Sequence, residues 1–202
     1  MKLVGKPLDK HLLSQIGCFF LLAILTLILQ QGVYIADSLI VGNILGKAEF
    51  AAITASTTVL RLPVNVAVGF SSGITIILAH ALENRRNDKE GKIVSAGLHA
   101  SILVGIIVTI TAFAFAPMLL RWSQVPGAIL SNALLCFRIY LFGTVFVFFT
   151  NICIGAIRAY EDALSPLLVM GGSLLLNILL DFLFVYAFDL PGAAIATVLT
   201  QA

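Results

Sequence analysis

Residues 165–188 read SPLLVMGGSLLLNILLDFLFVYAF, a continuous apolar stretch whose only charged residue is Asp181. A helix needs about 20 such residues to cross a bilayer, so this stretch is long enough to do so. A carboxylate within hydrocarbon costs about 3 kcal/mol on the insertion scale, so such an acid is a functional-site hypothesis by default. This stretch therefore predicts both a membrane-spanning helix and a site within it.

The composition of the whole chain agrees with a membrane protein. Hydrophobic residues make up 60% of it and charged residues only 11%, whereas soluble domains carry about 25% charged residues. We therefore expect an integral membrane protein that contacts lipid. The basic residues fall in loops rather than on one face, and we expect no nucleic-acid partner.

Apolar runs of similar length recur along the chain and predict an all-α fold. The expected class is a polytopic transmembrane bundle with five full helices and a truncated sixth, forming one six-helix lobe over residues 1–202. The expected spans are 13–42, 50–82, 93–116, 128–157, 165–188 and 192–202. The last is about half the length of a full span, so we expect a fragment of a longer protein.

The orientation of the bundle is predicted from lysine and arginine, which favour cytoplasmic loops. One side of the membrane carries Lys2, Lys6, Lys10, Arg85, Arg86, Lys89, Lys92 and Arg158. The other carries only Lys47 and Arg121. We therefore expect an inner (plasma) membrane protein with a cytoplasmic N-terminus.

A second acid, Asp37, lies within the first span at a similar depth to Asp181. From the helical rise, Asp37 lies about 8 Å, Asp181 about 10 Å and Thr197 about 8 Å below the outer boundary. Asn177 lies one turn deeper than Asp181 on the same helix face. Four oxygen-bearing side chains from three helices thus share one level, which predicts a proton or Na⁺ site made by Asp37, Asn177, Asp181 and Thr197.

Three of these four residues have simpler interpretations. Asp37 would end the first helix at the headgroups, Asn177 would join helices by a hydrogen bond, and Thr197 would bond to its own helix backbone. Asp181 lacks such an alternative, because seven further residues of the apolar span follow it. Two arginines, Arg61 and Arg138, also lie within spans. They would serve in packing, line a polar cavity, or act as counter-ions of the acids.

Several short motifs resemble the multidrug and toxic compound extrusion (MATE) transporters, in the order and spacing of that family. They are ADSLIVGNILG at residues 36–46 with Ala51-Ala52, GFSSG at 69–73, RAYED at 158–162 with Pro166, NILLD at 177–181, and GAAIAT at 192–197. The likeness extends from about residue 8 to the last residue. One departure is Phe182, where the family commonly has proline.

This resemblance implies a secondary antiporter, not an enzyme, that exports drugs or organic cations in exchange for H⁺ or Na⁺ and needs no cofactor. The family fold has twelve helices in two lobes around a central cavity. The resemblance implies that Asp37 and Asp181 carry ion coupling and that Asn177 and Thr197 join them. Since only the first lobe is present, we expect the chain to be inactive unless a missing C-terminal lobe or a second copy completes it.

Three other functions compete with this one. A flippase for lipid-linked saccharides shares the helical layout, but we expect it to carry more cationic residues for a pyrophosphate-bearing substrate. Two intramembrane aspartates would also suit a protease dyad that shares a proton. Ile178, Leu179 and Leu180 precede Asp181 where such proteases have glycine-rich sequence. An inert fragment is the third alternative.

Overall fold

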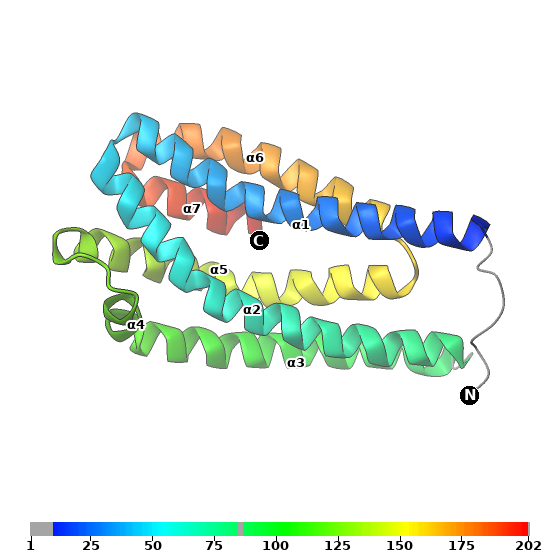
Figure 1. The fold of residues 1–202 in the computed structure, drawn as a ribbon. Helices are drawn as coiled ribbons and strands as arrows, with labels where there is room; N and C mark the ends of the chain where they lie inside the picture. Colours follow the sequence, from blue (N-terminus) through cyan, green and yellow to red (C-terminus); the bar gives the residue numbers. More distant parts are fainter. Residues whose placement is uncertain (1–9, 85–86, 202) are drawn as a thin grey trace.

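The structure, a computed structural model, describes residues 10–84 and 87–201, and every regular element in these ranges is an α-helix. The helices are α1 (Lys10–Ile44), α2 (Lys47–Glu83), α3 (Asn87–Ala114), α4 (Ala116–Trp122), α5 (Gly127–Ala159), α6 (Leu164–Phe188) and α7 (Leu190–Gln201) (Figure 1). Helices α1, α2, α3, α5 and α6 are each long and apolar enough to cross a membrane. The all-α class expected from the sequence is confirmed.

The observed boundaries differ from the expected ones mainly at the third span. Residues 93–116 were expected to form one helix, but α3 ends at Ala114 and the separate helix α4 begins at Ala116. Pro117 explains the break, because proline suits the first turn of a helix and disrupts its interior. The other long helices begin and end within a few residues of the expected limits.

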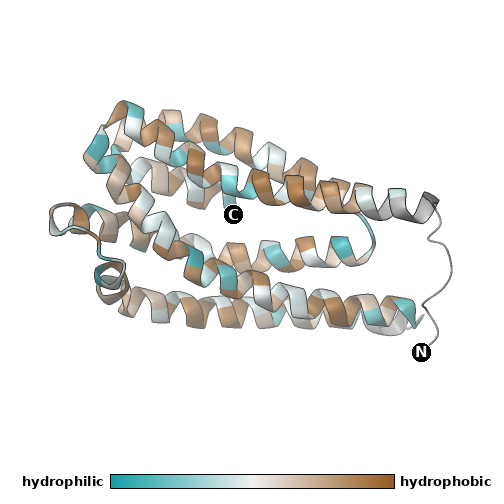
Figure 2. Cartoon of the chain, viewed as in Figure 1, coloured by the Kyte–Doolittle hydropathy of each residue, from teal (hydrophilic) through white to brown (hydrophobic). Residues whose placement is uncertain are grey.

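Helix α5 is the central element of the bundle. It packs against α2, α3 and α7, while α1 packs mainly against α6. Figure 1 accordingly shows α1, α6 and α7 grouped on one side and α2 with α3 on the other. Large apolar side chains such as Leu103, Ile110 and Leu183 remain exposed on the outside. Figure 2 shows apolar residues along the length of every long helix. An apolar exterior of this kind is that of an integral membrane protein, which faces lipid.

The bundle has two ends, which we name by residues in their turns. The Gly46 end carries the α1–α2 turn, α4 and the α6–α7 turn, and Gly46 itself has a φ of 112°, a conformation that glycine adopts without strain. The Asn84 end carries the α2–α3 and α5–α6 turns. Four basic residues of the orientation argument, Lys2, Lys6, Arg85 and Arg86, lie outside the described residues. The orientation therefore stays a prediction.

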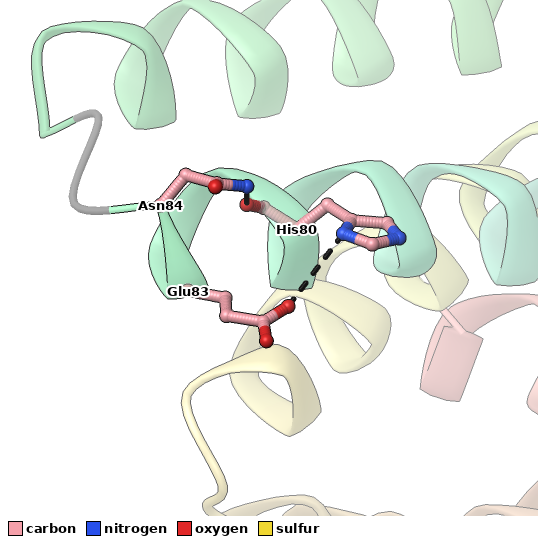
Figure 3. Close-up of polar contacts among 3 residues, drawn as sticks. All are labelled: His80, Glu83 and Asn84. Atoms are coloured by element: carbon pink, nitrogen blue, oxygen red, sulfur yellow. Dashed lines mark hydrogen bonds and ion pairs between the residues drawn. The ribbon is translucent and has the colours of Figure 1, made fainter. Parts of the chain in front are cut away.

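The last turn of α2 forms a small polar cluster at the Asn84 end (Figure 3). The side-chain amide of Asn84 donates to the carbonyl oxygen of His80 at 2.7 Å, and His80 Nδ1 lies 3.6 Å from Glu83 Oε2. Both members of this pair are largely exposed. Exposed pairs of this kind contribute little to stability, about 0–1 kcal/mol, so this cluster ends the helix rather than building a site.

Candidate functional site

The four residues expected to form a site come from three helices and are all fully buried. Asp37 lies on α1, Asn177 and Asp181 on α6, and Thr197 on α7, each with 0% exposure. Helices α1 and α7 both pack against α6, which brings the three polar stretches to one place. The structure therefore places the four side chains together. Their role in ion coupling stays a prediction.

Thr197 is the hydrogen-bonding centre of this group. Its hydroxyl donates to Asp37 Oδ2 at 2.6 Å and also approaches the carbonyl oxygen of Ala193 at 3.1 Å. The Asn177 amide donates to the Thr197 hydroxyl at 3.4 Å. Thr197 thus contacts its own backbone, as the simpler interpretation held, but it also joins α7 to α1. Asn177 similarly joins α6 to α7.

A fifth member of the site, Tyr140 on α5, was not expected from the sequence. Its hydroxyl donates to Asp37 Oδ2 at 3.2 Å, and its side chain is 1% exposed. A tyrosine in an apolar span usually has a polar partner when it is buried. A tyrosine within an apolar span was therefore the available signal. Its partner, Asp37, follows only from how α5 is rotated about its axis in the bundle.

Several acceptor oxygens of the site lack a hydrogen-bond donor among the described residues. They are Asp37 Oδ1, Asn177 Oδ1, Asp181 Oδ1 and Asp181 Oδ2. Asp37 and Asp181 lie on α1 and α6, two helices that pack against each other. Burying a charge without a partner is costly. A proton or a small cation held by these oxygens would relieve that cost, so this set of oxygen ligands fits H⁺ or Na⁺.

The same group does not resemble a site for a transition metal. Among the residues that the structure describes, no cluster of three or more His, Cys, Asp or Glu side chains could hold a metal ion. Two carboxylates with amide and hydroxyl oxygens suit hard cations rather than soft ones.

The headgroup interpretation of Asp37 is excluded by the structure. Helix α1 continues beyond Asp37 to Ile44, and the carboxyl group is buried rather than exposed to solvent or headgroups. Asp37 therefore lies inside the bundle, with the next two turns of α1 between it and the Gly46 end.

Neither arginine pairs directly with the acids. The only ion pair within 4 Å among the described residues joins His80 to Glu83. Arg61 is exposed on α2, while the Arg138 guanidinium lies 5.1 Å from the centre of the Phe113 ring on α3. Arg138 thus makes a cation–π contact between α5 and α3, in line with the structural role considered for it. The alternative in which the two arginines act as counter-ions of the acids is therefore not seen in the structure.

A pocket of about 270 Å³ adjoins the site on the side toward the Asn84 end. Its position follows from helix spacing, because Tyr34, Ser173 and Thr200 lie one turn from Asp37, Asn177 and Thr197 respectively. The lining side chains are all uncharged at neutral pH. They are Gln30, Val33, Tyr34, Val147, Thr150, Asn151, Val169, Met170, Ser173, Thr200 and Gln201. The sequence had not indicated this pocket, since its walls come from four helices.

Two curated bacterial proteins are similar to this chain over most of its length. The probable multidrug resistance protein YpnP of Bacillus subtilis is 27% identical over 195 residues, which cover 95% of this chain and 43% of YpnP. The probable multidrug resistance protein YoeA of the same organism is 23% identical and covers 90% of this chain and 41% of YoeA. The chain therefore spans less than half the length of these relatives.

Solved structures show the same helical arrangement. A crystal structure of MATE in the bent conformation has a TM-score of 0.86 at 26% identity, covering 93% of this chain and 42% of that one. A MOP superfamily transporter from Pyrococcus furiosus has a TM-score of 0.80 at 27% identity, covering 90% of this chain and 40% of that one. That protein is described as having a binding pocket of reverse polarity that suggests a different function.

The family profile agrees with these similarities and with the motifs in the sequence. The profile of the MatE family matches residues 23–183, a range that includes Asp37, Asn177 and Asp181. The chain belongs to the MatE family of transporters, and the resemblance noted in its sequence is confirmed.

Proposed function

We propose that this chain forms the ion-coupling half of an antiporter that exports organic cations in exchange for H⁺ or Na⁺. The observation that carries this proposal is the pair of buried acids, Asp37 and Asp181. One oxygen of Asp37 and both oxygens of Asp181 have no hydrogen-bond donor among the described residues. Two nearby negative charges repel each other, and a bound cation removes the repulsion. A cation that stabilises one arrangement of the helices more than another shifts the equilibrium between them.

The uncharged pocket beside the acids supports export of drugs over flipping of lipid-linked saccharides. A pyrophosphate-bearing lipid is best held by arginine or lysine, and the pocket lining contains neither. Amide and hydroxyl groups, with Tyr34 and Met170, instead suit an organic molecule bound partly by apolar contact. The acids one turn away favour a positively charged substrate.

The remaining parts of the proposal concern the assembly and its membrane. The N-terminus would be cytoplasmic in the plasma membrane, which places the Gly46 end on the outer side. A second lobe, or a second copy of this chain, would form the other wall of the transport pathway. The Asp37–Asp181 pair would take up its cation when exposed to one side of the membrane and release it on the other.

The test is drug efflux by a transporter in which residues 1–202 replace the matching part of YpnP. We expect Asp37→Asn and Asp181→Asn each to abolish ethidium efflux from cells that lack their own exporters, at matched membrane expression. Each amide removes the charge that the cation neutralises, so cation binding no longer drives a change of shape. Asp189→Asn is the matched control, because Asp189 is exposed in the α6–α7 turn.

Two results would count against the proposal. Normal efflux by the Asp181→Asn variant would remove Asp181 from the coupling mechanism. Absence of efflux with the unmodified lobe, although the chimaera reaches the membrane, would show that this lobe does not support drug export.

A further inference from the structure

Helix α4, seven residues long, is too short to cross a membrane and packs only one of its faces against the bundle. It joins the candidate spans Glu90–Ala114 and Gly127–Ala159 at the Gly46 end (Figure 1). The first of these spans has 25 residues, which at 1.5 Å per residue is about 37 Å and exceeds the hydrocarbon thickness of about 30 Å. A helix longer than the hydrocarbon core reaches the headgroups when it crosses the bilayer, so α4, which follows the end of this span, would lie at the membrane boundary in that arrangement.

Helix α4 has two distinct faces. Ala116 and Leu120, four residues apart, are fully buried against the bundle. Met118 and Trp122, also four residues apart, face outward, and Trp122 is 76% exposed. Such a helix buries one side in protein and presents an apolar, aromatic side to its surroundings.

The outward face also carries a positive charge. Arg121 is exposed next to Trp122, and no acidic side chain lies within ion-pairing distance of it among the described residues. A guanidinium matches the geometry of a phosphate group and binds it through two hydrogen bonds. Tryptophan is enriched at the boundary between headgroups and acyl chains.

We propose that α4 is an interfacial anchor that binds an anionic phospholipid in the leaflet at the Gly46 end. Arg121 contacts the lipid phosphate, and Trp122 and Met118 lie against the glycerol region and the upper part of the acyl chains. The charge complementarity and the position of α4 between two span ends together select a phospholipid over a protein partner. Binding holds the outer ends of α3 and α5 at a fixed depth in the bilayer.

Trp122 is the only tryptophan in the chain, so its fluorescence reports on α4 alone. The full chain is reconstituted into phosphatidylcholine vesicles in which a small fraction of the lipid is brominated phosphatidylglycerol. We expect bromine high on the acyl chain to quench Trp122 more than bromine near the methyl end, and aqueous iodide to quench it weakly. One basic residue near a membrane surface contributes about 1 kcal/mol toward anionic lipid, so phosphatidylglycerol should be enriched about fivefold at Trp122.

Two variants separate the role of Arg121 from a nonspecific attraction of anionic lipid to basic residues. Arg121→Gln should reduce the quenching to that expected from random lipid mixing. Lys47→Gln, the control at the other exposed basic residue of the Gly46 end, should leave the enrichment unchanged. The proposal is overturned if iodide quenches Trp122 as strongly as it quenches free tryptophan, if deep bromine quenches most, or if Arg121→Gln keeps the enrichment.

Discussion

At the scale of single residues, the two acids of the site differ in how well the protein satisfies them. Asp37 accepts hydrogen bonds from Thr197 and Tyr140 through the same oxygen, Oδ2. Neither oxygen of Asp181 has a donor among the described residues. The protein thus supports a negative charge on Asp37 more than one on Asp181. Asp181 is accordingly the carboxyl whose free energy a proton or Na⁺ would lower most.

Tyr140 offers a test of whether hydrogen bonding to Asp37 matters for coupling. We expect Tyr140→Phe to lower ethidium efflux by the chimaeric transporter at least tenfold, because a hydrogen bond to a charged group contributes about 1.5–3 kcal/mol. The ring and its packing are retained, so membrane expression should stay the same. Tyr186→Phe is the control, since Tyr186 is 77% exposed. Equal efflux by both variants would show that the Tyr140 hydroxyl has no part in coupling.

The sequence located some of these residues and missed others for a physical reason. Depth along a helix follows from residue number, and it indicated that Asp37, Asn177 and Thr197 could meet, as their hydrogen bonds show. The direction of a side chain around its helix depends on how the helices pack. Tyr140 therefore could not be assigned to Asp37, and Arg138 could not be assigned to the Phe113 ring.

At the scale of helices, α2 and α5 share the most extensive contact among the described helices. The Ser56 hydroxyl donates to the carbonyl oxygen of Ala133 at 2.8 Å, and the Ser71 hydroxyl donates to that of Asn151 at 2.6 Å. Small residues at helix interfaces allow this close approach in membranes, and hydrogen bonds across the interface add to it. Gly155 faces the same stretch of α2.

Gly155→Ala should therefore destabilise the bundle. A Cβ atom at this position would lie 2.7 Å from the Ser71 hydroxyl and still closer to that of Thr75. Overpacking costs about 1–3 kcal/mol, which exceeds or cancels the gain of about 1 kcal/mol in helix propensity. Thermal unfolding of the purified chain in detergent measures the effect. Gly69→Ala is the control, as no atom lies within 4 Å of its added Cβ, and a lower midpoint for this control than for Gly155→Ala would contradict the interface.

Helix α6 begins with a cap whose effect should depend on pH. The Asp162 carboxylate accepts hydrogen bonds from the hydroxyl and the backbone N–H of Ser165 and from the N–H of Leu164. These bonds lower the pKa of Asp162 below its ordinary value, and the bond from the Ser165 hydroxyl contributes most. The stabilisation is therefore present above the unfolded pKa of about 3.9 and is lost as pH falls through the lower pKa of the folded state.

We expect Asp162→Ala to lower the thermal unfolding midpoint of the chain at pH 7. The difference from the unmodified chain should disappear as the pH falls well below 4, where the carboxylate is protonated in both states. Glu83→Ala, at an exposed position near the same end of the bundle, serves as the control. A difference that stays constant across this pH range would mean that Asp162 does not act through its charge.

The five long helices were predictable because a membrane requires long apolar runs, and each run was present. Helix α4 was not predicted, because seven residues are too few for a hydropathy pattern and its first residue, Ala116, fell within the expected span 93–116. Pro117 was the available signal, since proline is favoured in the first turn of a helix.

At the scale of the whole molecule, the chain forms one lobe of helices with the polar side chains of the candidate site on the inside. The Asp37–Asp181 pair and the adjoining pocket lie between α1, α5, α6 and α7, and the outer faces are apolar. The curated relatives are more than twice as long. The pocket and the acids therefore belong to the part of the fold that this chain contains, and their cation binding can be measured on the chain itself.

We propose that Asp37 and Asp181 bind one cation together. Binding to the folded state raises its stability, by about 2.7 kcal/mol at a concentration 100 times the dissociation constant. The deciding measurement is the thermal unfolding midpoint of the purified chain across a series of pH values and Na⁺ concentrations. We predict that either H⁺ or Na⁺ raises the midpoint of the unmodified chain by several degrees, that Asp181→Asn removes this dependence, and that Asp189→Asn retains it. An Asp181→Asn variant with the same cation dependence as the unmodified chain would contradict the shared site.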